Sequence, residues 1–169
     1  MLLYKGLCTL SRIESVSMPM VTSTEECNCF AVRAAARHVT QAYDQLLAPS
    51  GLRTTLFSIL PKLKQLGPLT INTLARDMVM DRTTLGRNIL PLERDGLIRI
   101  EATASDRRAK ELHLTKAGEK RLQEALKAWS QAQARFETSF GIKRASELRT
   151  SLRAVVATRF TPTAQFADQ

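Results

Sequence analysis

The stretch LTINTLARDMVMDRTTLGRNILPLERDGLIRIEATASDRRAKELHL, residues Leu69–Leu114, decides the fold of this chain. Its first half predicts two short helices, because Thr70 and Asp81 each stand where a helix N-cap belongs and apolar residues follow at helical spacing. The inward residues are Ile71, Leu74 and Met78 in the first helix, and Leu85, Ile89 and Leu92 in the second. Gly96 ends the second helix, so this part of the sequence predicts a helix-turn-helix.

Two short strands are predicted directly after this pair of helices. Residues 97–100 form a largely apolar strand, and residues 111–114 alternate polar and apolar side chains as its partner. The charged segment 102–110 between them is expected to connect the strands as a wing. The fold class is therefore mainly α with a small two-stranded antiparallel wing. Such a winged helix-turn-helix is typical of DNA-binding proteins.

The second predicted helix carries polar side chains on the face opposite its apolar anchors. With Leu85 as the inward reference and about 100° per residue, Thr83 and Arg87 fall close to the opposite side. Guanidinium, amide and hydroxyl groups pair with base edges and phosphates, and a recognition helix contacts DNA through its N-terminal residues. The DNA-contacting residues predicted on this helix are Arg82, Thr83, Thr84, Arg87 and Asn88. The alternative is an ordinary solvated helix face without a ligand.

Longer helical patterns flank this unit on both sides. Ser23 and Glu26 form an S-x-x-E capping box, which predicts the start of a helix that runs to residue 49. That helix is rich in alanine and has a wide apolar stripe, so we expect its surplus face to contact another subunit. The remaining predicted helices cover residues 52–66, 116–140 and 142–160.

The chain of 169 residues carries a net charge of +9, which points to a polyanionic partner or to a generally basic surface. Residues 70–110 contain eight basic and six acidic side chains, whereas residues 116–160 contain ten and four. Basicity alone therefore does not locate a DNA site. Aromatic residues make up only 5% of the chain, which disfavours a single-strand binder built on base stacking.

Several protein classes are excluded by what the sequence lacks. No apolar run is long enough for a membrane span, and the first residues make a poor signal peptide, so a loose tail or a later start at Met18 or Met20 is expected. Three cysteines are too few for a disulfide framework, which favours a cytoplasmic protein. His38 and His113 are too sparse for a zinc site, and we expect no metal and no cofactor. No phosphate loop or catalytic constellation is present, so an enzyme is not expected.

Cys27 and Cys29 leave two interpretations open. On a helix, residues two apart point about 200° away from each other, which disfavours a shared metal or an easy disulfide between them. They would then be small packing residues near a helix start. The other interpretation is redox sensing, since a cysteine near a helix N-terminus gains thiolate character and a dimer could bring a second cysteine close.

The order and spacing of these features resemble the MarR family of winged-helix transcriptional regulators over residues 24–160. The most specific parts of the resemblance are Leu92-Glu93-Arg94-Asp95-Gly96-Leu97-Ile98, Asp106-Arg107-Arg108 and Leu114-Thr115-Lys116-Ala117-Gly118. The departures from the family pattern are Pro61 and Pro91 within helices, where each proline removes a backbone hydrogen bond and would distort the helix, and Leu56 where a Gln is frequent.

The resemblance implies a homodimer whose N- and C-terminal helices form the dimerisation region. Recognition helices would enter successive major grooves of a pseudo-palindromic double-stranded DNA, and wings would touch the flanking minor grooves. Arg108 looks like the wing arginine that enters the minor groove, Asp106 like the carboxylate that orients it, and Arg107 would face solvent or phosphate. The expected organisation is an N-terminal tail at 1–22, a first dimerisation helix at 23–49, a winged helix-turn-helix lobe at 50–115, C-terminal dimerisation helices at 116–160 and a tail at 161–169.

The resemblance also suggests a small-molecule pocket between the dimerisation helices and the DNA-binding lobe. A cation for a carboxylate and rings for an aromatic body would suit the phenolic compounds and aromatic acids that are common family ligands. The candidate lining residues are Arg33, Arg37, His38, Tyr43 and Phe57. Core packing explains Tyr43 and Phe57 equally well.

The sequence thus predicts a sequence-specific transcriptional regulator, a repressor of nearby genes that a small ligand releases from DNA. Release would follow from a shift in population toward dimers whose recognition helices have the wrong separation. Two alternatives remain at this point. One is an oxidant-sensing repressor that uses Cys27 or Cys29, and the other is a winged-helix protein-interaction module that does not bind DNA.

Overall fold

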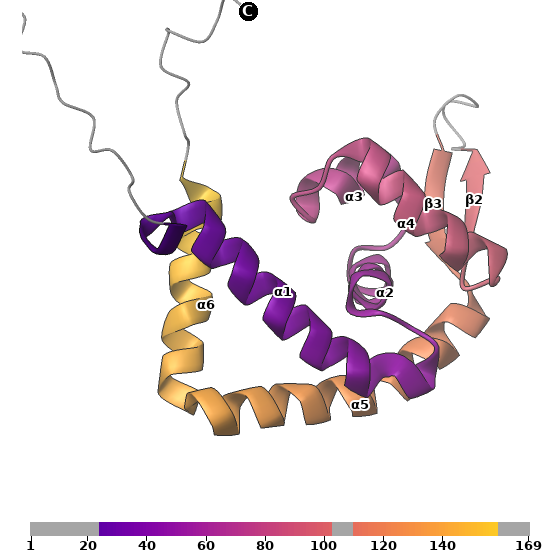
Figure 1. Ribbon diagram of the computed structural model, residues 1–169. Helices are drawn as coiled ribbons and strands as arrows, with labels where there is room; N and C mark the ends of the chain where they lie inside the picture. The colour runs from indigo at the N-terminus through magenta and orange to yellow at the C-terminus, as the bar shows by residue number, and fades with distance from the viewer. Residues whose placement is uncertain (1–23, 103–109, 159–169) are drawn as a thin grey trace, which may run out of the picture. The chain divides into compact units, whose positions relative to one another are not determined.

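The computed structural model describes residues 24–102 and 110–158, which form a mainly helical protein with one small sheet (Figure 1). The chain divides into two compact units, residues 1–37 and 38–169. The helices are α1 Asn28–Leu47, α2 Thr54–Leu66, α3 Ile71–Asp77, α4 Arg82–Arg94, α5 Lys116–Phe140 and α6 Ile142–Ala157. The strands are β1 Leu69–Thr70, β2 Ile98–Ala102 and β3 Lys110–Leu114, and short 3-10 turns lie at Thr24–Glu26 and Ala48–Ser50.

The sheet confirms the predicted wing and adds one short strand to it. All three strands are antiparallel, in the order β1-β3-β2. Ile100 of β2 and Leu69 of β1 lie opposite Leu112 of β3, on its two sides. Two residues are too short for a period-2 pattern, so β1 could not be recognised as a strand from sequence. Thr70 ends β1 and also caps α3 by accepting a hydrogen bond from the amide of Thr73.

The core lies inside the 38–169 unit, and every element of the helix-turn-helix contributes to it. Leu85, Ile89 and Leu92 of α4 are buried as predicted, and Leu74 of α3 and Leu112 of β3 are fully buried beside them. The other fully buried large side chains are Leu47, Ile59, Leu60, Ile98 and Leu122. Removing this apolar surface from water is the main stabilising contribution to the lobe.

The start of α5 packs against the backbone segment that connects α4 to β2. Thr115 caps α5 by accepting a hydrogen bond from the amide of Gly118, and its hydroxyl donates to the carbonyl of Gly96. A Cβ added at Gly118 would lie 2.0 Å from the carbonyl oxygen of Leu97. Only glycine therefore allows α5 to approach the backbone at the beginning of β2 this closely.

Helices α3 and α4 end in the same motif with different residues. After α4, the amide of Gly96 donates to Glu93 and the next amide donates to Leu92, with Gly96 in the left-handed conformation. After α3, the amide of Val79 donates to Arg76 and the amide of Met80 donates to Ala75. Val79 therefore takes the position that Gly96 has after α4, with φ 54°. This Schellman ending normally uses glycine, so the β-branched Val79 is a strained residue in the turn before α4.

Two predictions about the helices need correction or refinement. Helix α1 begins at Asn28 rather than after Ser23, because a 3-10 turn at Thr24–Glu26 precedes it; Ser23 itself lies outside the described residues. Pro61 and Pro91 do not interrupt α2 and α4, which both continue past them. Among the described residues, no helix is long and apolar enough to span a membrane.

Candidate nucleic-acid interface and ligand cavity

The N-terminus of α4 is fixed by two hydrogen bonds that Thr84 donates to Asp81. Asp81 accepts from the amide of Thr84 at 2.8 Å and from its hydroxyl at 2.6 Å. The hydroxyl and amide of Thr84 hold the pKa of Asp81 below its ordinary value, so the cap is a carboxylate at neutral pH. The Thr84 hydroxyl is therefore already used as a donor, and toward a ligand it can act only as an acceptor without breaking the cap.

The remaining predicted residues of α4 form an open polar face. Arg82, Thr83 and Arg87 are exposed and Asn88 is half-buried. None of the four side chains forms a hydrogen bond or ion pair with any other residue in the described part of the chain. Because the opposite side of α4 is buried in the core, these side chains are held at the surface. Their hydrogen-bonding groups have no partner among the described residues and can bind a ligand.

Sequence reasoning missed one member of this face, Leu90. It follows Arg87 by three residues, so both project from the same side of α4, and it is 61% exposed. Apolar side chains in a recognition surface can contact thymine methyl groups. The three-residue spacing between Arg87 and Leu90 is the feature of the sequence that could have identified Leu90 as part of this face. Arg94, further along, is paired with Asp95 at 2.9 Å, which raises the pKa of Arg94.

The predicted wing residues Asp106, Arg107 and Arg108 lie outside the described residues, and their roles stay predictions. The strands below them are described. His113 of β3 places its Nε2 at 3.5 Å from Glu101 and 3.8 Å from Glu111, which lie opposite each other on β2 and β3. His113 is thus a half-buried structural residue. No cluster of three metal-ligating side chains occurs among the residues that the structure describes.

A cavity of about 500 Å³ lies among α1, α2 and α5, and we call it the α1–α2–α5 cavity. Its lining residues are Val39, Thr40, Tyr43, Thr54, Phe57, Ser58, Pro61, Lys62, Gln65, Leu126 and Trp129. The rings of Phe57 and Trp129 are stacked there, with centroids 6.2 Å apart. Two of the five residues predicted for a ligand pocket, Tyr43 and Phe57, therefore do line one cavity.

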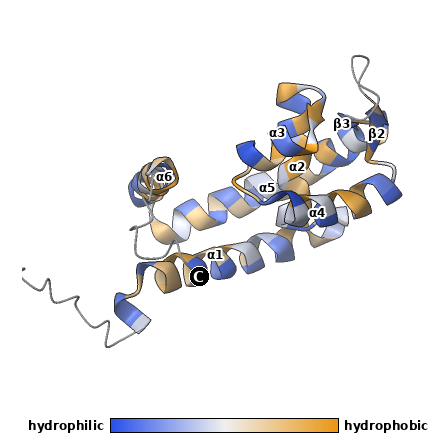
Figure 2. Cartoon of the chain, turned by 90° about the horizontal axis from the view of Figure 1, so that it is seen from above, coloured by the Kyte–Doolittle hydropathy of each residue, from blue (hydrophilic) through white to orange (hydrophobic). Residues whose placement is uncertain are grey.

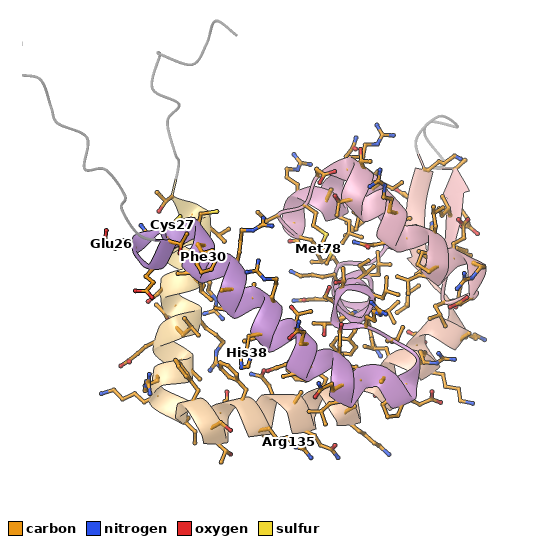
Figure 3. All side chains as sticks on the ribbon, in the orientation of Figure 1. Glu26, Cys27, Phe30, His38, Met78 and Arg135 are labelled. Atoms are coloured by element: carbon orange, nitrogen blue, oxygen red, sulfur yellow. The ribbon has the colours of Figure 1, made fainter. Side chains whose placement is uncertain are left out.

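The other predicted pocket residues lie elsewhere. His38 lines a second opening of about 500 Å³, together with Arg135 and the stacked Phe136 and Phe140. Figure 3 labels His38 on α1 and Arg135 on α5. Arg33 and Arg37 are exposed residues of the 1–37 unit, and their part in a pocket stays a prediction.

Tyr43 forms the wall shared by the two openings and begins a polar chain. Its hydroxyl donates to Gln133 of α5, whose amide donates to Glu137 at 3.5 Å. Arg149 of α6 donates to the same carboxylate oxygen at 3.0 Å. Burial, and then the nearby Glu137 carboxylate, raises the pKa of Tyr43, so the phenol stays protonated. This network fixes α6 relative to α5.

Cys27 and Cys29 are both free thiols, and Figure 3 labels Cys27 directly before α1. Cys27 precedes the helix, and its Sγ accepts a hydrogen bond from the amide of Phe30 at 3.5 Å. The prediction that both cysteines belong to one helix is therefore wrong, because the 3-10 turn delays the helix start. The argument from opposite helix faces does not apply to this pair.

The fold and the open face of α4 define a winged helix-turn-helix protein, and comparisons with known proteins agree. A family model described as MarR family matches residues 52–110. The transcriptional regulator MosR of M. tuberculosis is 36% identical, over 80% of this chain and 100% of the other, with a TM-score of 0.69. The structure of MosR in complex with DNA gives 39% identity over the same shares and a TM-score of 0.68.

A probable transcriptional regulator from Pseudomonas aeruginosa is 25% identical, over 79% of this chain and 99% of the other, with a TM-score of 0.71. No curated protein sequence matches the chain. The chain therefore belongs to the MarR family.

Proposed function

We propose that this protein is a non-enzymatic, sequence-specific DNA-binding repressor that acts in the cytoplasm as a homodimer. The observation that carries the proposal is the face of α4, where Arg82, Thr83 and Arg87 are exposed without partners among the described residues while the opposite face is locked in the core. The 39% identical relative MosR has been solved in complex with DNA, which supports the same role here.

The chemistry of the α4 face suits the major groove. Arg87 can form a bidentate pair with guanine and Asn88 with adenine, while Leu90 can contact a thymine methyl. Arg82 and Thr83, in the first turn, are placed for phosphate contacts near the helix N-terminus. Unused donors on a rigid scaffold also disfavour the alternative of a protein-interaction module that does not bind DNA.

Dimerisation would place two copies of this face on one side of the DNA. The exposed apolar side chains of α6 and of the first turns of α1 need cover, and a second copy of the chain supplies it. Recognition helices roughly 34 Å apart then match one turn of DNA and select a pseudo-palindrome. In this arrangement Arg108 enters the minor groove beside each half-site, Asp106 orients it, and Arg107 stays near phosphate or solvent.

A small aromatic molecule in the α1–α2–α5 cavity would release the repressor. Phe57 and Trp129 provide stacking surfaces, and Tyr43 and Lys62 provide a hydroxyl and a cation. A ligand that binds better to dimers with the wrong spacing of the recognition helices lowers operator affinity by shifting the population. Calorimetry on free and operator-bound dimers tests this step, since equal effector affinity for both would exclude it.

DNase I footprinting on the intergenic DNA upstream of the protein's own gene tests the proposed function. We expect one protected region of about two helical turns with two-fold symmetric sequence. Arg108→Ala should weaken binding most when the flanks of that region are rich in A·T pairs. Protection without a preferred position would contradict sequence-specific binding.

The N-terminal cysteines support a second candidate, an oxidant-sensing repressor. Cys27 accepts the Phe30 amide at the helix start, and Cys29 is exposed one residue into α1. The test compares release of operator DNA by hydrogen peroxide in the wild type and in a variant carrying Cys27→Ser and Cys29→Ser. Loss of release in the variant would support sensing by these thiols, and an unchanged response would leave them as packing residues.

A further inference from the structure

Thr84 of α4 has a hydroxyl group whose single hydrogen is already used inside the helix cap. The hydroxyl donates to Oδ2 of Asp81 at 2.6 Å, and the amide of Thr84 donates to Oδ1 at 2.8 Å. The Thr84 hydroxyl, and then its amide, hold the pKa of Asp81 below its ordinary value, so the carboxylate has no proton to donate at neutral pH. The direction of the bond is therefore fixed, with Thr84 as donor and Asp81 as acceptor.

The lone pairs of the Thr84 hydroxyl oxygen remain available at the surface. Thr84 is an exposed residue, and a hydroxyl that donates one hydrogen bond can still accept others. Because the side chain and the amide of Thr84 both bind one carboxylate, rotation of the hydroxyl is restricted and the lone pairs keep a defined direction. Thr84 therefore differs from a free hydroxyl, which can turn either to donate or to accept.

Thr84 lies in the part of α4 from which a recognition helix contacts bases. Arg87 and Asn88 follow it by three and four residues, so their side chains are its neighbours on the helix surface. The N-terminal residues of such a helix reach base edges in the major groove. Phosphate oxygens accept hydrogen bonds and donate none, so Thr84 has no partner on the DNA backbone while its cap is intact. The donors that remain are the amino groups of bases, N6 of adenine and N4 of cytosine.

We propose that Thr84 is a specificity-determining residue that accepts a hydrogen bond from the amino group of an adenine or a cytosine, and that Asp81 is the positioning residue that makes this hydroxyl an acceptor. The inference rests on the proposed DNA-binding function and adds which bases one position of each half-site admits. Guanine and thymine present only acceptors in the major groove, so either would face the Thr84 oxygen without a hydrogen between them. Arg87 has the opposite polarity, because a guanidinium group only donates.

Binding isotherms on the operator found by footprinting, changed at single positions, test the base preference. We expect one position in each half-site at which adenine and cytosine on the same strand bind about 3- to 10-fold more tightly than guanine and thymine, which is the scale of one hydrogen bond. Replacing that adenine by purine, or that cytosine by 2-pyrimidinone, removes only the amino group and should cost the same factor. Thr84→Val should abolish the preference, and Thr84→Ser should retain it.

Asp81→Asn tests the positioning role, because asparagine caps a helix as well as aspartate does while its amide group can donate to the Thr84 oxygen. The Thr84 hydrogen is then free, and the preference for adenine and cytosine should fall at least about threefold. The variant also loses a negative charge near DNA, which raises affinity for every operator, so the readout is the ratio of affinities between operators. Glu93→Gln, which removes an exposed carboxylate from the same helix, is the matched control and should leave that ratio unchanged.

Thermal unfolding confirms that each variant is folded. The inference is overturned if no position favours both adenine and cytosine, if Thr84→Val keeps that preference, or if Asp81→Asn leaves the ratio as it is in the wild type. Specific operator binding despite such a failure would leave the proposed function standing. Equal binding of operator and scrambled DNA by the wild type would reject the proposed function and this inference together.

Discussion

The DNA-binding lobe and helix α6 differ sharply in what happens to their apolar residues. In the lobe, Leu74, Leu85 and Leu112 are fully removed from solvent. In α6 only Ala145 is buried, while Ile142 is 72% and Val156 is 63% exposed. Apolar and polar residues are mixed along α6 in Figure 2.

This difference separates what one chain can stabilise alone from what it cannot. A single chain closes the core of the lobe, to which Leu47 of α1 and Leu122 of α5 also contribute, so the recognition helix is formed and oriented in one copy. Helix α6 leaves Leu152, Val155 and Val156 at the surface together, and such a patch is typical of a subunit interface. We infer that folding of the lobe and pairing of the chains are separable, and the following variants test this.

Charge placed on the α6 patch should have the greatest effect on DNA binding. Leu152→Asp combined with Val156→Asp puts two carboxylates where a second copy is expected to pack. Loss of the dimer removes the gain from two linked half-sites, so operator affinity should fall about 10²–10⁴-fold. Analytical ultracentrifugation should show monomers with an intact lobe. Ser151→Asp, on the same helix, is the control and should stay dimeric; a dimeric double variant would contradict the assignment of α6.

Leu85→Ala should damage the lobe itself. Leu85 is fully buried under α4, and truncating such a side chain costs about 2–5 kcal/mol of unfolding free energy. Leu90→Ala on the exposed face of the same helix should change stability by less than about 0.5 kcal/mol while weakening operator binding. Urea unfolding of both variants makes the comparison. Equal losses of stability would show that the two faces of α4 are not distinct.

Arg87→Ala should reduce operator affinity by about 1–3 kcal/mol and relax base preference at one position in each half-site. Its unfolding free energy should not change, because Arg87 has no partner among the described residues. Arg94→Ala is the control on the same helix, since Arg94 is paired with Asp95. Binding isotherms on operators changed at single positions distinguish the two, and uniform weakening on all operators would make Arg87 a phosphate contact.

Val79→Gly should give a small increase in stability. Glycine removes the cost of the left-handed conformation but adds freedom to the unfolded chain, which leaves a net gain of about 0.5–1 kcal/mol. Thermal unfolding of this variant, with Gly96→Val as the reverse change at the equivalent turn after α4, measures the effect. A loss of stability in Val79→Gly would mean that the valine side chain has contacts that offset its strain.

The sequence predicted those features of the fold that depend on local chemistry. Thr70 and Asp81 cap their helices as expected, and Gly96 ends the helix that precedes it. The two-residue strand β1 was missed because it forms only by pairing with β3. The predicted start of the first helix was wrong because a 3-10 turn at Thr24–Glu26 precedes α1.

The candidate site was only partly predictable for the same reason. Exposure of Arg82 and Arg87 follows from helical periodicity within α4. The ion pair of Lys62 and Asp77, by contrast, joins two helices whose packing the sequence pattern does not specify. Tyr43 and Phe57 line one cavity together with Lys62, and their part in ligand binding stays a prediction.

Titration of the purified protein with its own upstream intergenic DNA and with scrambled DNA, at two salt concentrations, tests the central claim most directly. A sequence-specific regulator should prefer the upstream DNA at least about 10³-fold, and the preference should persist at the higher salt while the scrambled DNA loses most of its binding. Equal affinity for both DNAs, with the same steep salt dependence, would contradict the claim that the α4 face recognises a sequence.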